Sequence, residues 1–154
     1  MLPFEPVGHF PHEHMDEQAR KLDRLEDNLR ELAHFQNTTL ADLDDEKTVR
    51  WGLRYGVMEA LQIAVDLACA IVSRRNLGDP EQPADCFRLL RQNGILSEAV
   101  ADRLIQTLDA RDTAAAAGPD VNDALVLDAL DRLSDFRTFA QDIRDNAPPS
   151  AASS

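Results

Sequence analysis

The feature that most constrains the fold is a long helical pattern over residues 45–75. Apolar side chains recur there at three- and four-residue steps without interruption, which is the period of one face of an α-helix. The repeating residues are Val49, Leu53, Val57, Leu61, Ala64, Val65, Ala68 and Val72. A helix of this length in a chain of 154 residues needs neighbours to cover its apolar side. We therefore expect it at the centre of the core.

The rest of the chain repeats the same kind of pattern in shorter segments. Helical periodicity covers residues 16–36, 84–92, 97–110 and 120–146, with turn-forming residues between them. Aromatic residues make up only 5% of the chain, and Leu and Ala dominate its apolar part, which favours helices over sheets. We predict an all-α fold, an up-and-down antiparallel bundle of four long helices and one short helix.

The two ends of the chain lack this periodicity. Residues 1–14 combine prolines and histidines without a period, so we expect a flexible leader. Met15 opens the first periodic segment and is an alternative start of the protein. Residues 15–146 are predicted to form a single domain, and the small, polar residues 147–154 a disordered tail.

The charge of the chain limits its partners. The formal net charge is −12 at pH 7, which argues against binding of nucleic acid over the whole surface, because phosphate contacts need many cations. A local contact with RNA stays open. The sequence contains no run of 18 apolar residues, so we expect no membrane span.

Cysteines and histidines suggest no cofactor chemistry. Cys69 and Cys86 lie within apolar patterns and lack metal-ligand spacing. We expect buried free thiols in the reducing cytoplasm, with a disulfide as the alternative. His9, His12 and His14 fall in the leader, where nothing would hold them in the geometry of a ligand set. We predict neither a metal site nor a cofactor.

Part of the long central pattern does not fit a simple core helix. Gly52 and Gly56 each weaken a helix relative to alanine, so another helix is expected to approach closely, and a second copy of the chain could supply it. Trp51 and Tyr55 lie on a second face that a partner subunit or another helix of the chain would cover. Asp66 interrupts the apolar run, where a carboxylate needs an arginine or a backbone partner unless it points to water. A structural ion pair is a more natural role for it than catalysis.

Several short phrases resemble a known family in their order and spacing. They occur at residues 21–25 (KLDRL), 50–55 (RWGLRY), 61–66 (LQIAVD) and 89–96 (LLRQNGIL). Over most of residues 15–144 the chain resembles the HepT-like members of the HEPN superfamily. The resemblance implies a small dimeric helical protein that is encoded beside a minimal nucleotidyltransferase antitoxin.

The family signature matches this chain only in part. It consists of an Arg, four residues of which the first is usually polar, a His, one residue and a Tyr, at the junction of the last two long helices. Arg111 fills the Arg position and Asp112 the polar position, but Ala116 stands in place of the His and Gly118 in place of the Tyr. The resemblance thus makes Arg111 and Asp112 the candidate catalytic residues.

The two departures affect the chemistry that the resemblance implies. In metal-independent RNA cleavage the 2′-hydroxyl attacks the neighbouring phosphate, which needs a cation and an acid/base group near neutral pKa. Arg111 supplies a cation, but Ala116 cannot transfer a proton. In the family the Tyr receives AMP from the nucleotidyltransferase, and Gly118 has no hydroxyl to modify.

Three functions follow as hypotheses. The first is a homodimeric, cytoplasmic HepT-like protein of a toxin–antitoxin module whose ribonuclease site has degenerated and lost activity. The second is a working ribonuclease with a displaced acid/base group. The third is a non-catalytic dimeric scaffold that binds a nucleotidyltransferase. A structural role for Arg111, at a helix end or paired with Asp66 or Asp109, is the alternative to any site.

Overall fold

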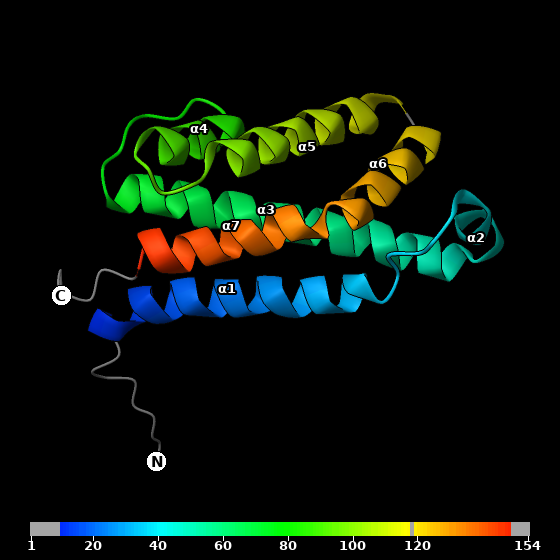
Figure 1. Ribbon diagram of the computed structural model, residues 1–154, viewed down its shortest axis with the longest axis horizontal. Coiled ribbons are helices and arrows are strands. Elements are labelled where there is room, and N and C mark those ends of the chain that lie inside the picture. The colour runs from blue at the N-terminus through cyan, green and yellow to red at the C-terminus, as the bar shows by residue number, and fades with distance from the viewer. Residues whose placement is uncertain (1–9, 118, 149–154) are drawn as a thin grey trace, which may run out of the picture.

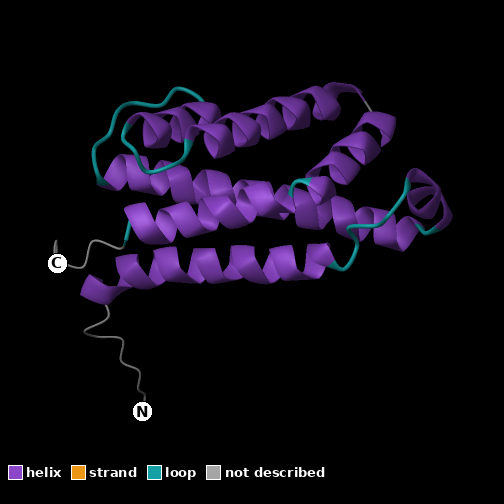
Figure 2. Ribbon diagram, viewed as in Figure 1, coloured by secondary structure: helices purple, strands orange, loops and turns teal. Residues whose placement is uncertain are grey.

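The computed structural model describes residues 10–117 and 119–148, with side chains for residues 17–115 and 122–148. In these residues the chain forms helices and no strands (Figure 2), which confirms the all-α prediction. The helices are α1 (Phe10–Ala33), α2 (Leu40–Asp45), α3 (Lys47–Arg74), α4 (Pro83–Gln92), α5 (Glu98–Ala117), α6 (Pro119–Asp131) and α7 (Leu133–Asn146).

Successive long helices run in opposite directions along the molecule, as the up-and-down prediction requires (Figure 1). The central helix α3 packs against α1, α4, α6 and α7, and α5 packs against α4, α6 and α7. The inner residues of α3, such as Leu61, Ala64 and Ala68, are fully buried. The apolar period of the sequence therefore places α3 at the centre of the bundle, where it was predicted.

Helix α3 is also long and apolar enough to cross a membrane by length and composition alone. In its most apolar 18-residue window, however, 61% of the residues are buried inside the protein. The core helix of a folded domain has this same property, and we interpret α3 in that way.

Local hydrogen bonds explain where the shorter helices begin. Thr39 caps α2: its hydroxyl accepts from the backbone N–H of Asp42, and the Asp42 carboxylate accepts from the backbone N–H of Thr39. Helix α4 begins with Pro83, and Asp85 accepts from the backbone N–H groups of Glu81 and Gln82. Pro83 at the first helical position needs no hydrogen-bond partner for its nitrogen.

The last predicted helix is divided in two, so the count of four long helices and one short helix was wrong. Arg132 lies between α6 and α7 with φ −114° and ψ 24°, outside the helical region. The backbone N–H groups of Arg132 and Asp135 bond to carbonyls only three residues back. Leu130 and Leu133 are buried on either side of the break, so the apolar pattern runs through it and did not reveal it.

The expectation of two free thiols was also wrong, because Cys69 on α3 and Cys86 on α4 form a disulfide. Antiparallel packing of these two helices brings their Cα atoms to 5.1 Å, a separation that a disulfide spans. Both residues lie within apolar helical patterns, as predicted, but the sequence did not show that they face each other. The argument for a reducing cytoplasm loses this support.

The boundaries of the structured region differ at the N-terminal end. Helix α1 begins at Phe10, within the predicted leader, whereas residues 1–9 and the end of the predicted tail, residues 149–154, lie outside the described residues.

Ion pairs connect α6 to α3. The Asp123 carboxylate, with a side chain only 4% exposed, accepts hydrogen bonds from Nε and Nη2 of Arg50 at 3.0 and 2.5 Å. Nη2 of Arg54 donates to the same carboxylate at 3.1 Å. A buried carboxylate with several charge-assisted donors is costly to disrupt, so this cluster fixes α6, and with it the approach to the α5–α6 junction.

Candidate functional site

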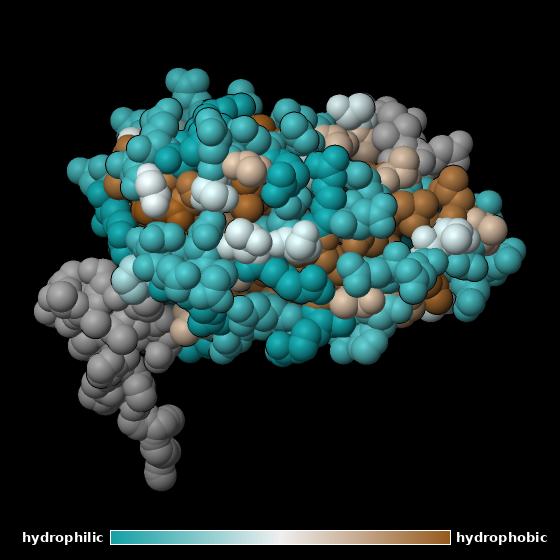
Figure 3. Space-filling model, in the orientation of Figure 1, coloured by the Kyte–Doolittle hydropathy of each residue, from teal (hydrophilic) through white to brown (hydrophobic). Residues whose placement is uncertain are grey.

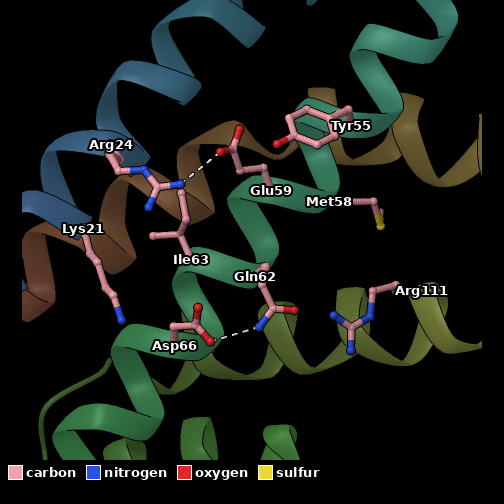
Figure 4. A pocket seen from close by; sticks show the side chains of 9 residues that line it. All are labelled: Lys21, Arg24, Tyr55, Met58, Glu59, Gln62, Ile63, Asp66 and Arg111. Atoms are coloured by element: carbon pink, nitrogen blue, oxygen red, sulfur yellow. Dashed lines mark hydrogen bonds and ion pairs between the residues drawn. The ribbon is translucent and has the colours of Figure 1, made fainter.

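A cavity of about 400 Å³ lies between α1, α3 and α5 and contains the candidate residue Arg111. It is lined by Lys21, Arg24, Tyr55, Met58, Glu59, Gln62, Ile63, Asp66 and Arg111. Figure 4 shows that the side chains of α1 enter from one side, those of α3 form the wall, and Arg111 of α5 closes the other side. The cavity gathers three cations and two carboxylates around apolar and aromatic side chains.

Helix α5 carries Arg111 to the cavity through its apolar period. Leu104 and Leu108 are buried in the core, and Arg111 follows one turn later on the same side of the helix. Its side chain is 27% exposed. Arg111 does not lie in the last turn of α5, so the alternative role at a helix end is wrong.

The second candidate, Asp112, lies outside the cavity. Its side chain is 73% exposed, and its Oδ1 atom lies 3.5 Å from Nε of Arg111. Among the described side chains this is the ion pair that Arg111 makes, in place of the considered pairs with Asp66 or Asp109. Exposed pairs of this kind contribute little to stability, so the pair with Asp112 gives Arg111 no strong structural role.

The two positions that depart from the family signature are at the end of α5. Ala116 is the last but one residue of that helix, but its side chain is outside the described part. Gly118 lies outside the described residues altogether. The positions of both relative to Arg111 therefore stay predictions.

Asp66 is placed differently from the expectation of an ion pair. It is exposed on α3, and its Oδ1 accepts a hydrogen bond from Nε2 of Gln62 at 3.0 Å. No arginine partner of Asp66 is present among the described side chains. Asp66 and Arg111 instead line the same cavity from two helices.

Most of the cavity was not singled out by the sequence. Lys21, Arg24 and Gln62 were visible only as parts of family-like phrases, and Glu59 only as a polar position of a helix. The sequence did contain a sign of the cavity. On the outward side of α3, four of the lining residues follow one another at helical spacing, namely Tyr55, Met58, Gln62 and Asp66. This stripe marks a helix face that the chain's own core does not cover.

The described residues offer no obvious metal centre. Among them no group of three or more His, Cys, Asp or Glu side chains is placed to hold a metal ion.

Comparison with solved structures finds chains that share this helical fold. A mutant toxin–antitoxin MntA–HpeT structure is 20% identical, with a TM-score of 0.73 over 84% of this chain and 98% of that chain. A tri-AMPylated HEPN toxin from Shewanella oneidensis, in complex with an MNT antitoxin, is 19% identical, with a TM-score of 0.73 over 83% of this chain and 96% of that chain. At these identities the likeness shows a shared fold, a HEPN-type helical bundle.

The sequence itself identifies the family. The family model described as ribonuclease HepT-like matches residues 25–143, most of the chain and every helix of the core. The protein belongs to the HepT-like family, which confirms the predicted resemblance. No match is found among curated proteins.

Proposed function

We propose that this protein is a HepT-like toxin-type component of a toxin–antitoxin module whose ribonuclease site has degenerated and no longer cleaves RNA. The observation that carries the proposal is that the site keeps a cation but lacks an acid/base group at the position of the family histidine. Arg111 is retained in a cavity with two further cations, whereas the His position holds Ala116, which cannot act as an acid or base.

Histidine is absent from the residues that line the described cavity. His34 is the one histidine of the described side chains, and it follows the end of α1 at a distance from the site in sequence. A positioned general acid/base contributes about 10²–10⁴-fold to a rate. A site that keeps only its cation should therefore be severely impaired.

One observation favours the second candidate, an active ribonuclease with a displaced acid/base group. Glu59 and Asp66 line the same cavity as Arg111, and a carboxylate can act as a general base. Incubation of the purified protein with transfer RNA tests both candidates. We expect no cleavage above that of buffer, and cleavage that Arg111→Ala or Asp66→Asn abolishes would overturn the proposal in favour of the second candidate.

A gain-of-function variant tests the degenerate position directly. If the rest of the site is intact, Ala116→His should raise RNA cleavage by about 10²–10⁴-fold, and adding Arg111→Ala should remove the gain. Because Ala116 lies near the end of α5, unchanged thermal unfolding serves as the control for folding. Failure of Ala116→His to restore any cleavage would indicate that more than the acid/base group has been lost, or that the chain is a scaffold.

We also propose that the protein is a homodimer and that α3 supplies the contact. A groove of about 350 Å³ runs between α1 and α3 and includes Phe35, Gly52 and Tyr55 in its lining. A Cβ atom added at Gly52 would meet nothing within 4 Å, so packing within the chain does not explain this glycine. Trp51 beside it is 60% exposed, and large exposed apolar groups typically mark an interaction surface.

Sedimentation of two matched variants tests this surface. Gly52→Leu introduces a side chain where the partner helix would approach and should produce a monomer that is still folded. Ala70→Leu adds the same side chain at an exposed position near the other end of α3 and should leave the dimer intact. A monomer at micromolar concentration in the unsubstituted protein would refute the dimer.

The proposed partner is a minimal nucleotidyltransferase that acts as antitoxin. Support comes from the solved complex of a HEPN toxin with an MNT antitoxin, which shares this fold. Co-purification with the product of an adjacent nucleotidyltransferase gene tests the pairing. We place the protein in the cytoplasm, where RNA and such a partner are found, and this placement now depends on the proposed function alone.

A further inference from the structure

We propose that the disulfide between Cys69 and Cys86 is a redox-sensitive switch, which locks α4 onto the central helix α3 and releases it on reduction. The proposal goes beyond the proposed function, because it depends on the packing of α4 and not on RNA or a partner protein. The bond joins the only two cysteines of the chain. Within one chain it can therefore open and close again without forming a wrong pair.

The two bonded residues differ in their access to solvent. Cys86 on α4 is only 1% exposed, whereas Cys69 on α3 is half-buried at the edge of the core. Thiol–disulfide exchange begins when a thiolate reaches one sulfur of the bond, so its rate depends on access. Cys69 gives a small thiol a route to the bond that two fully buried residues would not provide.

Reduction by a small dithiol follows from this difference in access. One thiolate of the dithiol attacks Sγ of Cys69, the bond to Sγ of Cys86 breaks, and Cys86 leaves as a thiolate that takes up a proton. The second thiol of the reductant then attacks the mixed disulfide and releases Cys69. The protein gains two electrons and two protons, and the dithiol becomes a disulfide.

Helix α4 keeps other anchors when the bond is open. Phe87 is fully buried and packs edge to face against Phe139 of α7, with ring centroids 5.8 Å apart. Leu90 is also fully buried, and Arg91 pairs with Asp102 of α5. A domain of this size also has a core large enough to fold without a covalent link. Reduction therefore produces a second folded state and not an unfolded chain.

The two states differ in how easily α4 opens. The disulfide limits the distance to which α4 can separate from α3, so its loss makes local opening of α4 more frequent. Helix α4 packs against α5, whereas α1 packs against α3 and α7. The effect should therefore extend from α4 to the start of α5, the helix that carries Arg111, and should not reach α1.

Hydrogen exchange of the full chain, measured by mass spectrometry with and without dithiothreitol, tests this local effect. We expect reduction to speed the exchange of amides in α4 by about tenfold to a hundredfold, with a smaller increase at the start of α5 and none in α1. An equal increase in α1 and α4 would show that the bond acts only on global stability, and it would overturn the switch. Unchanged exchange in α4 would overturn it as well.

The matched control is Cys69→Ser. This variant cannot form the bond, so its α4 should exchange at the rate of the reduced protein with or without dithiothreitol. A response of the variant to dithiothreitol would show that the reagent acts elsewhere, and it would remove the support for the switch. The comparison of the oxidised and reduced unsubstituted protein does not depend on how well the variant folds.

A redox titration tests whether the bond responds to cellular conditions. The unsubstituted protein is equilibrated in buffers with different ratios of reduced to oxidised glutathione, and the free thiols are then counted by alkylation and mass spectrometry. We expect the protein to change from mostly oxidised to mostly reduced within the range of ratios found between oxidising compartments and the cytoplasm. The same fraction should be reached from either starting state. A bond that stays intact at the most reducing ratio, or never forms at the most oxidising one, would overturn the proposal.

Discussion

The two halves of α3 differ in what their outward faces carry. In the second half, outward positions are polar, as at Gln62, Asp66 and Ser73, and the disulfide between Cys69 and Cys86 fixes α4 to it. In the first half, outward positions include Trp51 and Tyr55, which are exposed aromatic residues. The outward face of the second half thus carries polar side chains that water can cover. The outward face of the first half, called the open side below, carries aromatic side chains that the chain does not bury.

The two glycines of the first half show the same contrast within one helical turn. A Cβ atom at Gly56 would lie 3.0 Å from Cδ2 of Leu32 on α1, whereas a Cβ atom at Gly52 would meet nothing. Gly56 is therefore explained by packing within the chain and Gly52 is not.

The space-filling view also shows hydrophobic surface gathered toward the end of the molecule that carries α2 and α6 (Figure 3).

The largest expected effect comes from the core side of α3. Leu61 is fully buried, so Leu61→Ala should lower the free energy of unfolding by about 2–5 kcal/mol. Trp51→Ala, on the open side, should change it by no more than about 0.5 kcal/mol in the monomer. Urea unfolding of both variants measures the contrast, and equal losses would show that the open side is buried after all.

Removing the disulfide should have the next largest effect. Cys69→Ser opens a loop that spans 17 residues, and the chain-entropy model assigns about 3 kcal/mol to a loop of this size. Chemical unfolding with and without a reducing agent checks the value. The reducing agent should leave the Cys69→Ser variant unaffected, and a stability of the unsubstituted protein that does not respond to reduction would contradict the bond.

Replacing each glycine with alanine sharpens the comparison further. Gly52→Ala should stabilise the monomer by roughly 0.5–1 kcal/mol, since alanine favours a helix and the space is open. Gly56→Ala meets the buried Leu32, so repacking should offset this gain and destabilise the protein by about 1 kcal/mol or more. Thermal unfolding measures both, and a gain in stability with Gly56→Ala would show that α1 moves aside easily.

The smallest expected effect is a pH dependence at the start of α4. The backbone N–H of Glu81, followed by that of Gln82, lowers the pKa of the Asp85 carboxyl in the folded protein. A lowered folded pKa gives stability that is present above the usual aspartate pKa of about 4 and is lost as the pH falls through the lowered value. Asp85→Asn should make the loss of stability below about pH 4 shallower, as acid titration followed by circular dichroism would show.

The fold was predictable because its signals are local and periodic. The apolar period of α3 and the turn residues around Pro83 each act over a few residues, and the structure confirms the helices that they predict. The disulfide and the break at Arg132 depend on how helices face each other or on single backbone angles. Neither leaves a trace in the period of apolar residues.

Of the residues that line the cavity, only Arg111 was predicted from the sequence to be a catalytic residue. Arg111 was assigned from the family resemblance, and the structure places it in a cavity, whereas Asp112 is exposed and is not among the lining residues. The cavity itself combines Lys21 and Arg24 of α1 with side chains of α3 that are distant in sequence. Such a combination follows from the packing of helices and not from any spacing within one segment.

Both ends of the domain meet at one pole of the molecule. Nε2 of Gln18 in the first half of α1 donates to the carbonyl of Ala147 at 2.8 Å, and Nη2 of Arg75 donates to that of Pro148 at 2.9 Å. The opposite pole carries α2 (Figure 1). A circularly permuted chain with a short bridge between the old ends should therefore fold, and a fluorescent protein fused at either end would leave the α2 pole unobstructed.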